Sequence, residues 1–341
     1  MNILITSAGR RGYIIDYFKK ALKGDGKVYA GNSDIFAPAF SYADEYVVTP
    51  LIYDKEYIPF LVKFCKEKQI SVIISLFDID LWVLTNNKFF LEEHGIRVIV
   101  SDKSVINICN DKWNTYRFCT KNKILAPQTF LEYFDAETAI NEGKISFPVI
   151  IKPRWGMGSL AVYQADNVEE MKILFRKCVQ DIQETYLKYE AAFDRERCVI
   201  IQEKLNGQEY GMDIINDLNG TFCVNVVRKK IAMRSGETDC AIVEKNDQMD
   251  LLAKIISKLL GHIGNLDVDL FVNNGEVYLL EMNARFGGGY PFSYYAGVDL
   301  PQAIVRWVMG KKIDEELAIK KYNQIIQKDI QFVNLSESVD R

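Results

Sequence analysis

Four polar side chains that could bind a metal ion and an anion lie within residues 267–290, which read DVDLFVNNGEVYLLEMNARFGGGY. Two largely apolar runs on either side of Asn-Asn-Gly predict a β-hairpin. Because alternate residues of a strand share a face, Asp269 on the first strand can face Glu281 and Asn283 on the second. Two carboxylates and an amide oxygen are ligands that Mg²⁺ accepts while it also holds phosphate oxygens. Arg285 follows, where it would meet an anion beside the metal.

Glu281 distinguishes this hairpin from an ordinary solvated turn. It comes directly after the apolar residues 277–280, and a carboxylate at the end of such a strand is costly to bury without a cation. The three glycines at 287–289 would let the backbone approach a ligand closely. The stretch therefore predicts a metal site beside an anion-binding arginine.

A second candidate site begins where the apolar strand FPVIIKP ends in Lys152. Burying an ammonium group there requires a partner such as phosphate. The next residues, 154–159, read RWGMGS, and small residues such as Gly158 and Ser159 leave backbone amides free to close over phosphates. The GK[ST] helix start of a P-loop is absent. We therefore predict a phosphate-binding flap of another kind.

The elements that position these residues follow from the hydrophobic pattern. Short apolar strands alternate with helices over about the first 100 residues, which predicts a parallel sheet with ligands at the carboxyl ends of its strands. Three loops at that edge are candidates for binding the acceptor substrate: 7–12, 32–39 and 77–80. The segment 246–263 predicts a helix with its leucine and isoleucine side chains in the core.

Composition excludes several classes of protein. The length of 341 residues predicts about two domains, and the net charge of −4 provides no basic field for nucleic acid or anionic membranes. No apolar run approaches the roughly 20 residues that span a bilayer, and the N-terminal residues read as a strand and not as a signal peptide. Seven scattered cysteines without CxxC spacing predict reduced thiols in a cytoplasmic protein. With only two histidines, catalysis by a Ser/His or Cys/His pair is disfavoured.

In their order along the chain, these segments resemble the ATP-grasp superfamily, which contains carbamoyl phosphate synthetase, biotin carboxylase, D-alanine ligase and glycinamide ribonucleotide synthetase. EMNARFGGGYP resembles the metal-binding end of that fold, and KPRWGMGS resembles its flap. The resemblance implies that Lys152 and also Lys112, in the sequence DKW, are the two nucleotide-binding lysines.

The resemblance also implies the remaining nucleotide contacts. Adenine would lie against the linker formed by Glu203, Lys204 and Leu205, and Glu209 would contact the ribose. The sequence RKKIAMRSGETDCA resembles a loop that lies against the phosphates and the second substrate in related ligases, which implies that Arg234 faces the active site.

The fold implied is α/β and α+β, with a Rossmann-like parallel sheet followed by a two-lobed ATP-grasp domain. The expected ranges are 1–108 for the Rossmann-like (pre-ATP-grasp) domain, 109–310 for the ATP-grasp domain with its small nucleotide lobe at about 124–205, and 311–341 for a C-terminal extension. The resemblance is to single-unit proteins similar to the large subunit of carbamoyl phosphate synthetase.

The implied reaction is ATP-dependent activation of a carboxylate as an acyl phosphate, which an amine or a thiol then attacks, with ADP and phosphate released. Mg²⁺, or Mn²⁺ in its place, would lie on Asp269, Glu281 and Asn283, while Arg285 would stabilise the acyl phosphate. The expected partners are a small-molecule carboxylate and amine, and binding to nucleic acid or to a membrane is not expected. A homodimer is one possible oligomeric state.

The sequence departs from the family pattern at two points. The metal position has Asp269 where other members have Glu or Gln. A single ATP-grasp unit does not fit a complete carbamoyl phosphate synthetase reaction, which needs two phosphorylations, although a partial reaction of that kind stays open.

Three different functions also stay open. A ligase similar to glycinamide ribonucleotide synthetase would need a sugar-phosphate site, which Arg10 and Arg11 could supply. A nicotinamide-dependent oxidoreductase would fit the Rossmann-like sheet, although GxGxxG is absent. A non-catalytic nucleotide-binding module would use the same nucleotide contacts without turnover.

Overall fold

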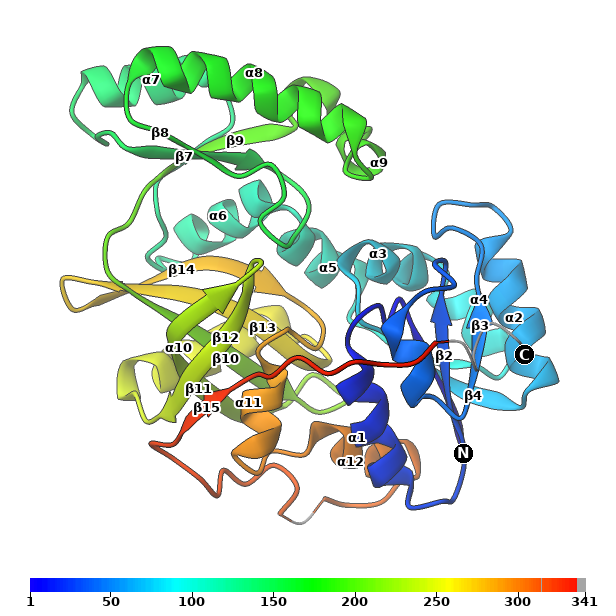
Figure 1. Ribbon diagram of the computed structural model, residues 1–341. Helices are drawn as coiled ribbons and strands as arrows, with labels where there is room; N and C mark the ends of the chain where they lie inside the picture. Colours follow the sequence, from blue (N-terminus) through cyan, green and yellow to red (C-terminus); the bar gives the residue numbers. More distant parts are fainter. Residues whose placement is uncertain (314, 336–341) are drawn as a thin grey trace.

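The N-terminal part of the chain is built on a parallel sheet. The computed structural model describes residues 1–313 and 315–335. Its first sheet has five parallel strands in the order β3-β2-β1-β4-β5, so that the strand order reverses beside β1 (Figure 1). This arrangement confirms the predicted Rossmann-like sheet. The strands are β1 (Asn2–Thr6), β2 (Val28–Asn32), β3 (Glu45–Val48), β4 (Ile70–Ser75) and β5 (Arg97–Ile99).

The helices of this region leave the carboxyl edge of the sheet open to the rest of the molecule. They are α1 (Gly12–Leu22), η1 (Pro38–Tyr42), α2 (Tyr57–Glu67), α3 (Asp78–Asn86), α4 (Lys88–Glu93) and α5 (Lys103–Asn110). The loops that follow the strands meet at this edge: the Ala39 amide donates to the Gly9 carbonyl at 3.0 Å, and the Arg11 guanidinium donates to the Leu76 carbonyl at 2.8 Å. The loops 7–12 and 32–39 therefore lie side by side, whereas residues 78–80 of the third predicted loop form the first turn of α3, where Asp80 accepts a hydrogen bond from Ser7.

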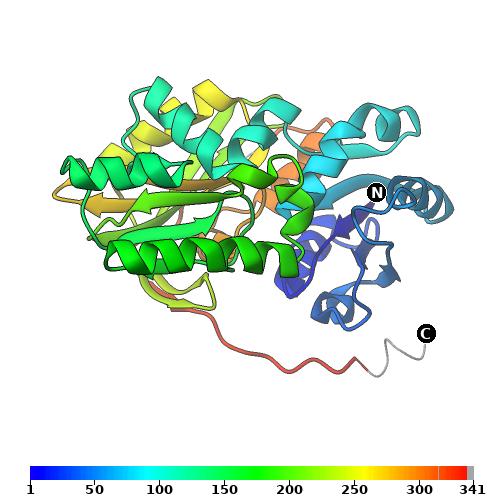
Figure 2. The same cartoon turned by 90° about the horizontal axis from the view of Figure 1, so that it is seen from above.

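A small lobe lies at the top of Figure 1 and forms a second sheet, with the order β6-β9-β7-β8. Helix α6 (Lys112–Lys121) leads into it. Its other elements are β6 (Thr129–Phe130), α7 (Tyr133–Asn141), β7 (Val149–Pro153), β8 (Tyr163–Ala165), α8 (Val168–Glu184), α9 (Lys188–Ala191), η2 (Arg195–Arg197) and β9 (Val199–Glu203). Figure 2 shows the lobe from above, with α7 and α8 running along it. Val149, Ile151 and Ile201 form the core beneath these helices with Met171.

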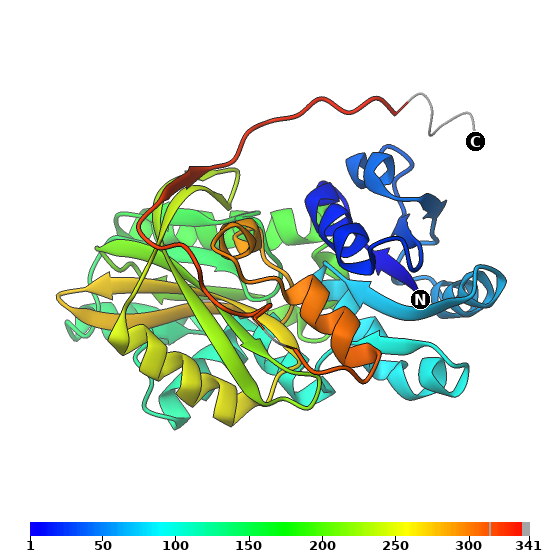
Figure 3. The ribbon, with the colours of Figure 1, turned by 90° about the horizontal axis from the view of Figure 1, so that it is seen from below.

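The large lobe contains a six-stranded antiparallel sheet in the order β14-β13-β10-β11-β12-β15. Its strands are β10 (Gln208–Asn216), β11 (Phe222–Arg234), β12 (Glu237–Glu244), β13 (Gly264–Asn273), β14 (Glu276–Asn283) and β15 (Ile325–Gln327). Its helices are α10 (Asp247–Leu260), α11 (Tyr290–Tyr295) and α12 (Leu300–Val308). Helices α10 and α12 are in the foreground when the molecule is seen from below (Figure 3).

The prediction for α10 is partly wrong. The helix exists, but Leu251, Ile255 and Leu259 are 62%, 40% and 45% exposed. Its buried face instead consists of Met249, Ala253, Ile256 and Ser257. Only one of the two apolar stripes along this helix packs against the sheet.

The last described residues, up to 335, include a strand and an extended segment. Strand β15 pairs with β12, and the chain then runs past α1 toward the N-terminal domain (Figures 1 and 3). The Tyr42 hydroxyl donates to the Gln331 side chain there at 3.3 Å. The predicted C-terminal extension, 311–341, includes residues 314 and 336–341, which lie outside the described residues. Within the described ranges, no helix combines the length and hydropathy needed to cross a membrane.

Candidate active site

The hairpin β13–β14 brings the predicted metal ligands together. Asp269 pairs directly with Glu281, and Asp267 pairs with Asn283, with a register shift between Asp269 and Leu270. The two pairs are two residues apart on each strand, so their four side chains share a face of the sheet. The sequence analysis identified three of these side chains and missed Asp267, although it stands at the same alternation as Asp269.

Two lysine side chains, Lys112 and Lys230, form ion pairs at this acidic face. The Lys112 ammonium lies 3.6 Å from a Glu281 oxygen and donates to the Gly156 carbonyl of the flap at 2.5 Å. Lys230 on β11 lies 2.6 Å from Asp269 and 2.5 Å from Glu209. Burial alone would lower the pKa of Lys230, but these two carboxylates raise it. Lys230 is therefore a further cation of the site, and its alternation with Arg228 in the strand was the signal that could have identified it.

Lys152 lies at the end of β7, as predicted, and no carboxylate among residues 1–313 and 315–335 forms an ion pair with it. Its side chain is 6% exposed, and its ammonium group donates to the Gln202 side-chain oxygen at 2.8 Å. Gln202 in turn donates to the Thr129 hydroxyl at 2.8 Å. Burial lowers the pKa of Lys152 to about 8. A buried ammonium group held only by a neutral amide suits a site that receives an anion.

The acidic face fits a magnesium ion in its donor chemistry. Among the described residues, no three His, Cys, Asp or Glu side chains converge as a complete set of metal ligands. Asp269 and Glu281 supply two carboxylates, and Asn283 adds a neutral oxygen on the same face. Mg²⁺ commonly binds one or two carboxylates and takes its remaining ligands from water and phosphate oxygens. Lys230 already bonds one Asp269 oxygen, so a cation here would share that carboxylate with it.

The predicted adenine and ribose contacts lie along the connection between the two lobes. Glu203 accepts a hydrogen bond from the Gln128 amide at 3.1 Å, and Leu205 is buried. The Lys204 ammonium group donates to Gln164 at 2.8 Å, near the protein surface. Glu209, at the start of β10, is the residue that Lys230 joins to the acidic face.

The flap at 154–159 is anchored at its first residue. The Arg154 guanidinium donates to both oxygens of Asp111, at 2.9 and 2.8 Å, and to Asp194 at 3.0 Å. Gly158 and Ser159 both have positive φ angles, of 68° and 58°. The tip of the β11–β12 hairpin touches them, because a Cβ added at Gly236 would lie 2.9 Å from the carbonyl carbon of Gly158.

Arg234 lies on that same hairpin and is about half exposed. It donates to Asp239 at 3.0 Å, and no contact within the described residues joins it to the metal hairpin. The structure thus joins Lys112 and Glu209 to the acidic face, and the charges of Glu281 and Asp269 also act on Lys152, while Arg234 and Lys204 lie at the margin of this face.

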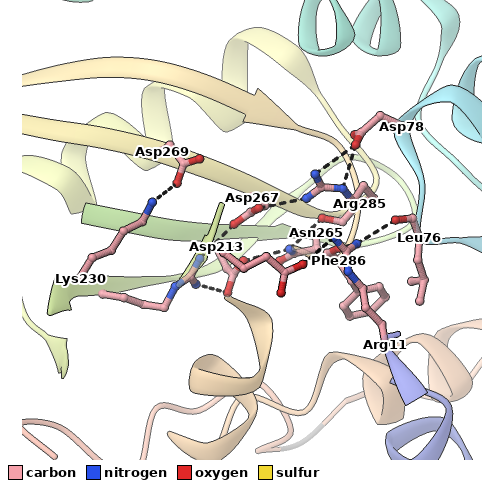
Figure 4. Close-up of polar contacts among 12 residues, drawn as sticks. Arg11, Leu76, Asp78, Asp213, Lys230, Asn265, Asp267, Asp269, Arg285 and Phe286 are labelled. Atoms are coloured by element: carbon pink, nitrogen blue, oxygen red, sulfur yellow. Dashed lines mark hydrogen bonds and ion pairs between the residues drawn. The ribbon is translucent and has the colours of Figure 1, made fainter. Parts of the chain in front are cut away.

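A buried network of charges lies behind the acidic face (Figure 4). Arg285 is held by Asp267 at 3.0 Å and by Asp78, from the N-terminal domain, at 3.1 Å. Arg228 pairs with Asp267 at 3.0 Å and with Asp213. Burial alone would lower the pKa of Arg285, but Asp78 and Asp267 raise it above its ordinary value. Arg285 therefore stays charged and is fixed from both domains.

The glycines at 287–289 serve this network. A Cβ added at Gly287 would lie 2.1 Å from the Asp267 carboxylate, and one added at Gly289 would lie 2.5 Å from the Arg228 guanidinium. At Gly288 the neighbour is the Glu237 carboxylate, at 2.6 Å. The space next to these glycines is filled by the protein's own charged side chains, which corrects the expectation that a ligand approaches there.

Two family models match the chain. One, described as the PylC-like N-terminal domain, matches residues 3–99, and the other, described as the ATP-grasp domain, matches residues 109–289. Because the second match covers more than half of the chain, the protein belongs to the ATP-grasp family.

The sequence identity to individual proteins is low, at 22% or less for the three described here. The carbamoyl phosphate synthase large chain of Pseudothermotoga lettingae is 22% identical over 237 residues, which make up 67% of this chain and 20% of that protein. The chain thus matches about a fifth of the length of this relative. Two solved structures show the same fold. The biotin carboxylase domain of Hydrogenobacter thermophilus 2-oxoglutarate carboxylase, solved with MgADP and bicarbonate, has a TM-score of 0.73 at 17% identity and covers 95% of this chain and 73% of that one. N5-carboxyaminoimidazole ribonucleotide synthetase from Thermotoga maritima has a TM-score of 0.65 at 19% identity and covers 94% and 78%.

Proposed function

We propose that this member of the ATP-grasp family is a Mg²⁺-dependent ligase that uses ATP to join a small-molecule carboxylate to an amine or a thiol. The observation that carries the proposal is the meeting of Lys112 and Lys230 with the paired carboxylates Asp269 and Glu281, where the flap and the hairpin face each other. Similar folds solved with MgADP support the choice of nucleotide and metal.

Each group of side chains has a separate task in this proposal. ATP bound with Mg²⁺ supplies the transferable phosphoryl group. Asp269, Glu281 and Asn283 hold the metal, and Lys112 and Lys152 hold phosphate oxygens. The bond from Lys112 to the Gly156 carbonyl ties one of these lysines to the flap, so that phosphate binding and flap position are linked.

The reaction requires two anions to approach each other. Two like charges 4 Å apart repel by about 4 kcal/mol at an effective dielectric of 20, so positioning and charge neutralisation are the main tasks of the protein. An oxygen of the substrate carboxylate attacks the γ-phosphorus, and the bond to the ADP oxygen breaks. The amine then attacks the acyl carbon, the bond to phosphate breaks, and the nitrogen loses a proton. Arg285 would stabilise the acyl phosphate, and no side-chain nucleophile is needed.

On the nucleotide side, we propose that Glu203, Lys204 and Leu205 line the adenine site and that Glu209 contacts the ribose. The link from Glu209 through Lys230 to Asp269 supports this proposal, because it joins the ribose contact to the metal hairpin. We also propose domain limits of 1–108, 109–310 and 311–341, and the family matches at 3–99 and 109–289 support the first of these boundaries.

The sugar-phosphate function has less support. Arg11 donates to the carbonyls of Leu76 and Phe286 at 2.8 and 3.1 Å, and its other terminal nitrogen lies 3.4 Å from Glu237. Arg11 thus already uses part of its hydrogen-bonding capacity within the protein, as Arg285 does with Asp78 and Asp267. The cytoplasmic location stays a prediction that rests on the seven free cysteines.

Calorimetry with ATP tests the first step, with and without Mg²⁺. We expect Mg²⁺-dependent binding, and phosphate release when the matching carboxylate and amine from a panel of small acids and amino acids are added, with the product measured by mass. If ATP affinity does not depend on Mg²⁺, the assignment of the acidic face is wrong. If ATP binds but no pair of substrates releases phosphate, the chain is a nucleotide-binding module.

A further inference from the structure

Three buried oxygen atoms between the N-terminal domain and the small lobe have no hydrogen-bond donor within the described part of the chain. They are Oδ1 of Asp78, Oδ1 of Asn110 and Oε2 of Glu190. Asp78 and Glu190 are 4% and 6% exposed. Buried polar atoms in proteins nearly always have a partner, so three unpartnered acceptors in one region call for a specific explanation.

The contacts around these residues place them in the same region. The Asn110 side chain donates to the backbone carbonyl of Asp78 at 2.8 Å. Glu190 lies in α9, and the segment 186–193 around it packs on the N-terminal domain. Tyr186 contacts the ring of Phe77, next to Asp78, with 6.0 Å between centroids. Burial and then the charge of Asp78 raise the pKa of Glu190 to about 8, and the charge of Lys112 offsets this only in part, so the two carboxyl groups lie near each other.

The nearby cations of the protein are already engaged elsewhere. Arg285 donates to the other oxygen of Asp78, Oδ2. Lys112 donates to the Gly156 carbonyl and faces Glu281. A group from outside the described chain that donates hydrogen bonds and carries a positive charge would satisfy the three free oxygens together. A primary ammonium group has this chemistry, with three N–H donors and no acceptor.

We propose that the amine substrate binds as an ammonium ion among Asp78, Asn110 and Glu190. The proposal rests on the proposed ligase function and names the class of its second substrate as a primary amine that is charged at neutral pH. Because Asp78 also holds Arg285, the subsite lies next to the residue assigned to the acyl phosphate. The bound ammonium must lose a proton before its nitrogen attacks the acyl carbon, and the ionised form of Glu190 can accept that proton.

The segment 186–193 closes this subsite from the solvent side. Tyr189 stacks on Tyr53 with 4.1 Å between ring centroids, and Phe193 lies edge-on to Trp82 at 6.0 Å. Tyr189 and Phe193 are nevertheless 43% and 68% exposed. Leu187 and Ala191 of the same segment are each 2% exposed and belong to the core of the small lobe, so the segment would move with that lobe, and this displacement would open a path for the amine.

Direct binding to the full chain tests the subsite. The probes are the common amino acids and 1,4-diaminobutane, each compared by calorimetry at pH 7 with the form in which every amino group is acetylated. We expect at least one probe to bind the parent, and its acetylated form to bind much more weakly. Glu190→Gln should weaken that binding by about tenfold or more, because a hydrogen bond to a charged group is lost. The control Glu196→Gln makes the same substitution at an exposed position in the same connection and should change nothing.

The outcomes separate this inference from the ligase proposal. If no probe binds the parent, or if Glu190→Gln binds the probes as the parent does, the subsite is refuted even where phosphate is released. If probes bind through Glu190 but no phosphate appears with ATP, Mg²⁺ and the acid panel, the subsite stands and the ligase assignment fails. In the active enzyme, Glu190→Gln should raise the KM for the amine and leave the KM for ATP unchanged. An equal change in both constants would indicate a purely structural role.

Discussion

Loss of the Lys152 charge should make the protein more stable as the pH rises, and replacing Lys152 with methionine should remove this gain. Most ion-paired lysines have the opposite effect, because they stabilise the folded protein only while they are charged. Lys152 is 6% exposed, and its only hydrogen-bond partner among the described residues is the neutral side chain of Gln202, at 2.8 Å. Burial lowers its pKa from 10.5 to about 8. The charged form of Lys152 is therefore less stable in the folded protein than in the unfolded chain.

The size of this effect follows from the shift. One pKa unit corresponds to about 1.4 kcal/mol, so a shift from 10.5 to about 8 costs the folded protein about 3 kcal/mol while Lys152 is charged. Below pH 8 both states carry the proton, and the cost is fully present. Between pH 8 and 10.5 the unfolded chain keeps the proton that the folded protein has lost, so the parent gains stability with rising pH. The Lys152→Met variant lacks this pH-dependent contribution to the free energy of unfolding.

Urea denaturation of the parent and of Lys152→Met at several pH values from 7 to 9.5 measures the difference. Loss of the bond to Gln202 affects the variant at every pH, so the change in the difference with pH isolates the ionisation. We expect the parent to gain about 2 kcal/mol on the variant between pH 8 and 9.5. Saturating ATP with Mg²⁺ should reduce this gain, because bound phosphate restores the pKa of Lys152. A difference that stays constant across the range would refute the depressed pKa.

Three further changes test the hairpin and its neighbours. Glu281→Gln should abolish Mg²⁺-dependent ATP turnover, and its far-ultraviolet circular dichroism spectrum should match that of the parent. The control Glu276→Gln, at the exposed start of the same strand, should keep full turnover. Equal activity of the two variants would contradict the assignment of Glu281 as a metal ligand. Lys230→Met leaves Glu209 and Asp269 without their cation, so it should lower the free energy of unfolding by about 3 kcal/mol. Added Mg²⁺ should raise the melting temperature of this variant more than that of the parent. An equal rise in both proteins would argue against an Asp269 carboxylate that Lys230 and Mg²⁺ share. Gly287→Ala places a methyl group 2.1 Å from the Asp267 carboxylate and should destabilise the protein by about 3 kcal/mol or more in denaturant titrations, and a loss below about 1 kcal/mol would show that the network yields easily.

The sequence predicts the hairpin well because its determinants are local. An Asn-Asn-Gly turn between two apolar runs defines the pairing, and the two-residue period then places Asp269 opposite Glu281. The same period places Asp267 on that face, but its partners are distant in sequence. Arg228 lies 39 residues away on β11, and only the sheet order brings the two strands into one lobe. The local pattern therefore gives the position of the acidic face but not the cations that neutralise it.

Helix α10 shows a different limit. Residues 251, 255 and 259 and residues 252, 256 and 260 form two adjacent stripes at the same spacing, so periodicity predicts both as core. In the structure Ile256 is fully buried while Ile255 on the neighbouring stripe is 40% exposed. The choice depends on how the helix is rotated against the sheet, which is set by tertiary packing. For the same reason the glycines at 287–289 could be recognised as sites of close approach, whereas the identity of what approaches them could not.

Asp78 explains why the N-terminal sheet belongs to the candidate active site. Arg285 follows the metal hairpin in the large lobe, yet one of its two carboxylate partners comes from the start of α3, 207 residues earlier in the chain. A buried guanidinium with only Asp267 would keep N–H groups unsatisfied and would be free to rotate. With Asp78 in place, its orientation depends on how the carboxyl edge of the parallel sheet meets the large lobe. Any ligand that alters the position of Asp78, including an amine bound beside it, would therefore act directly on the arginine that we assign to the reacting phosphate.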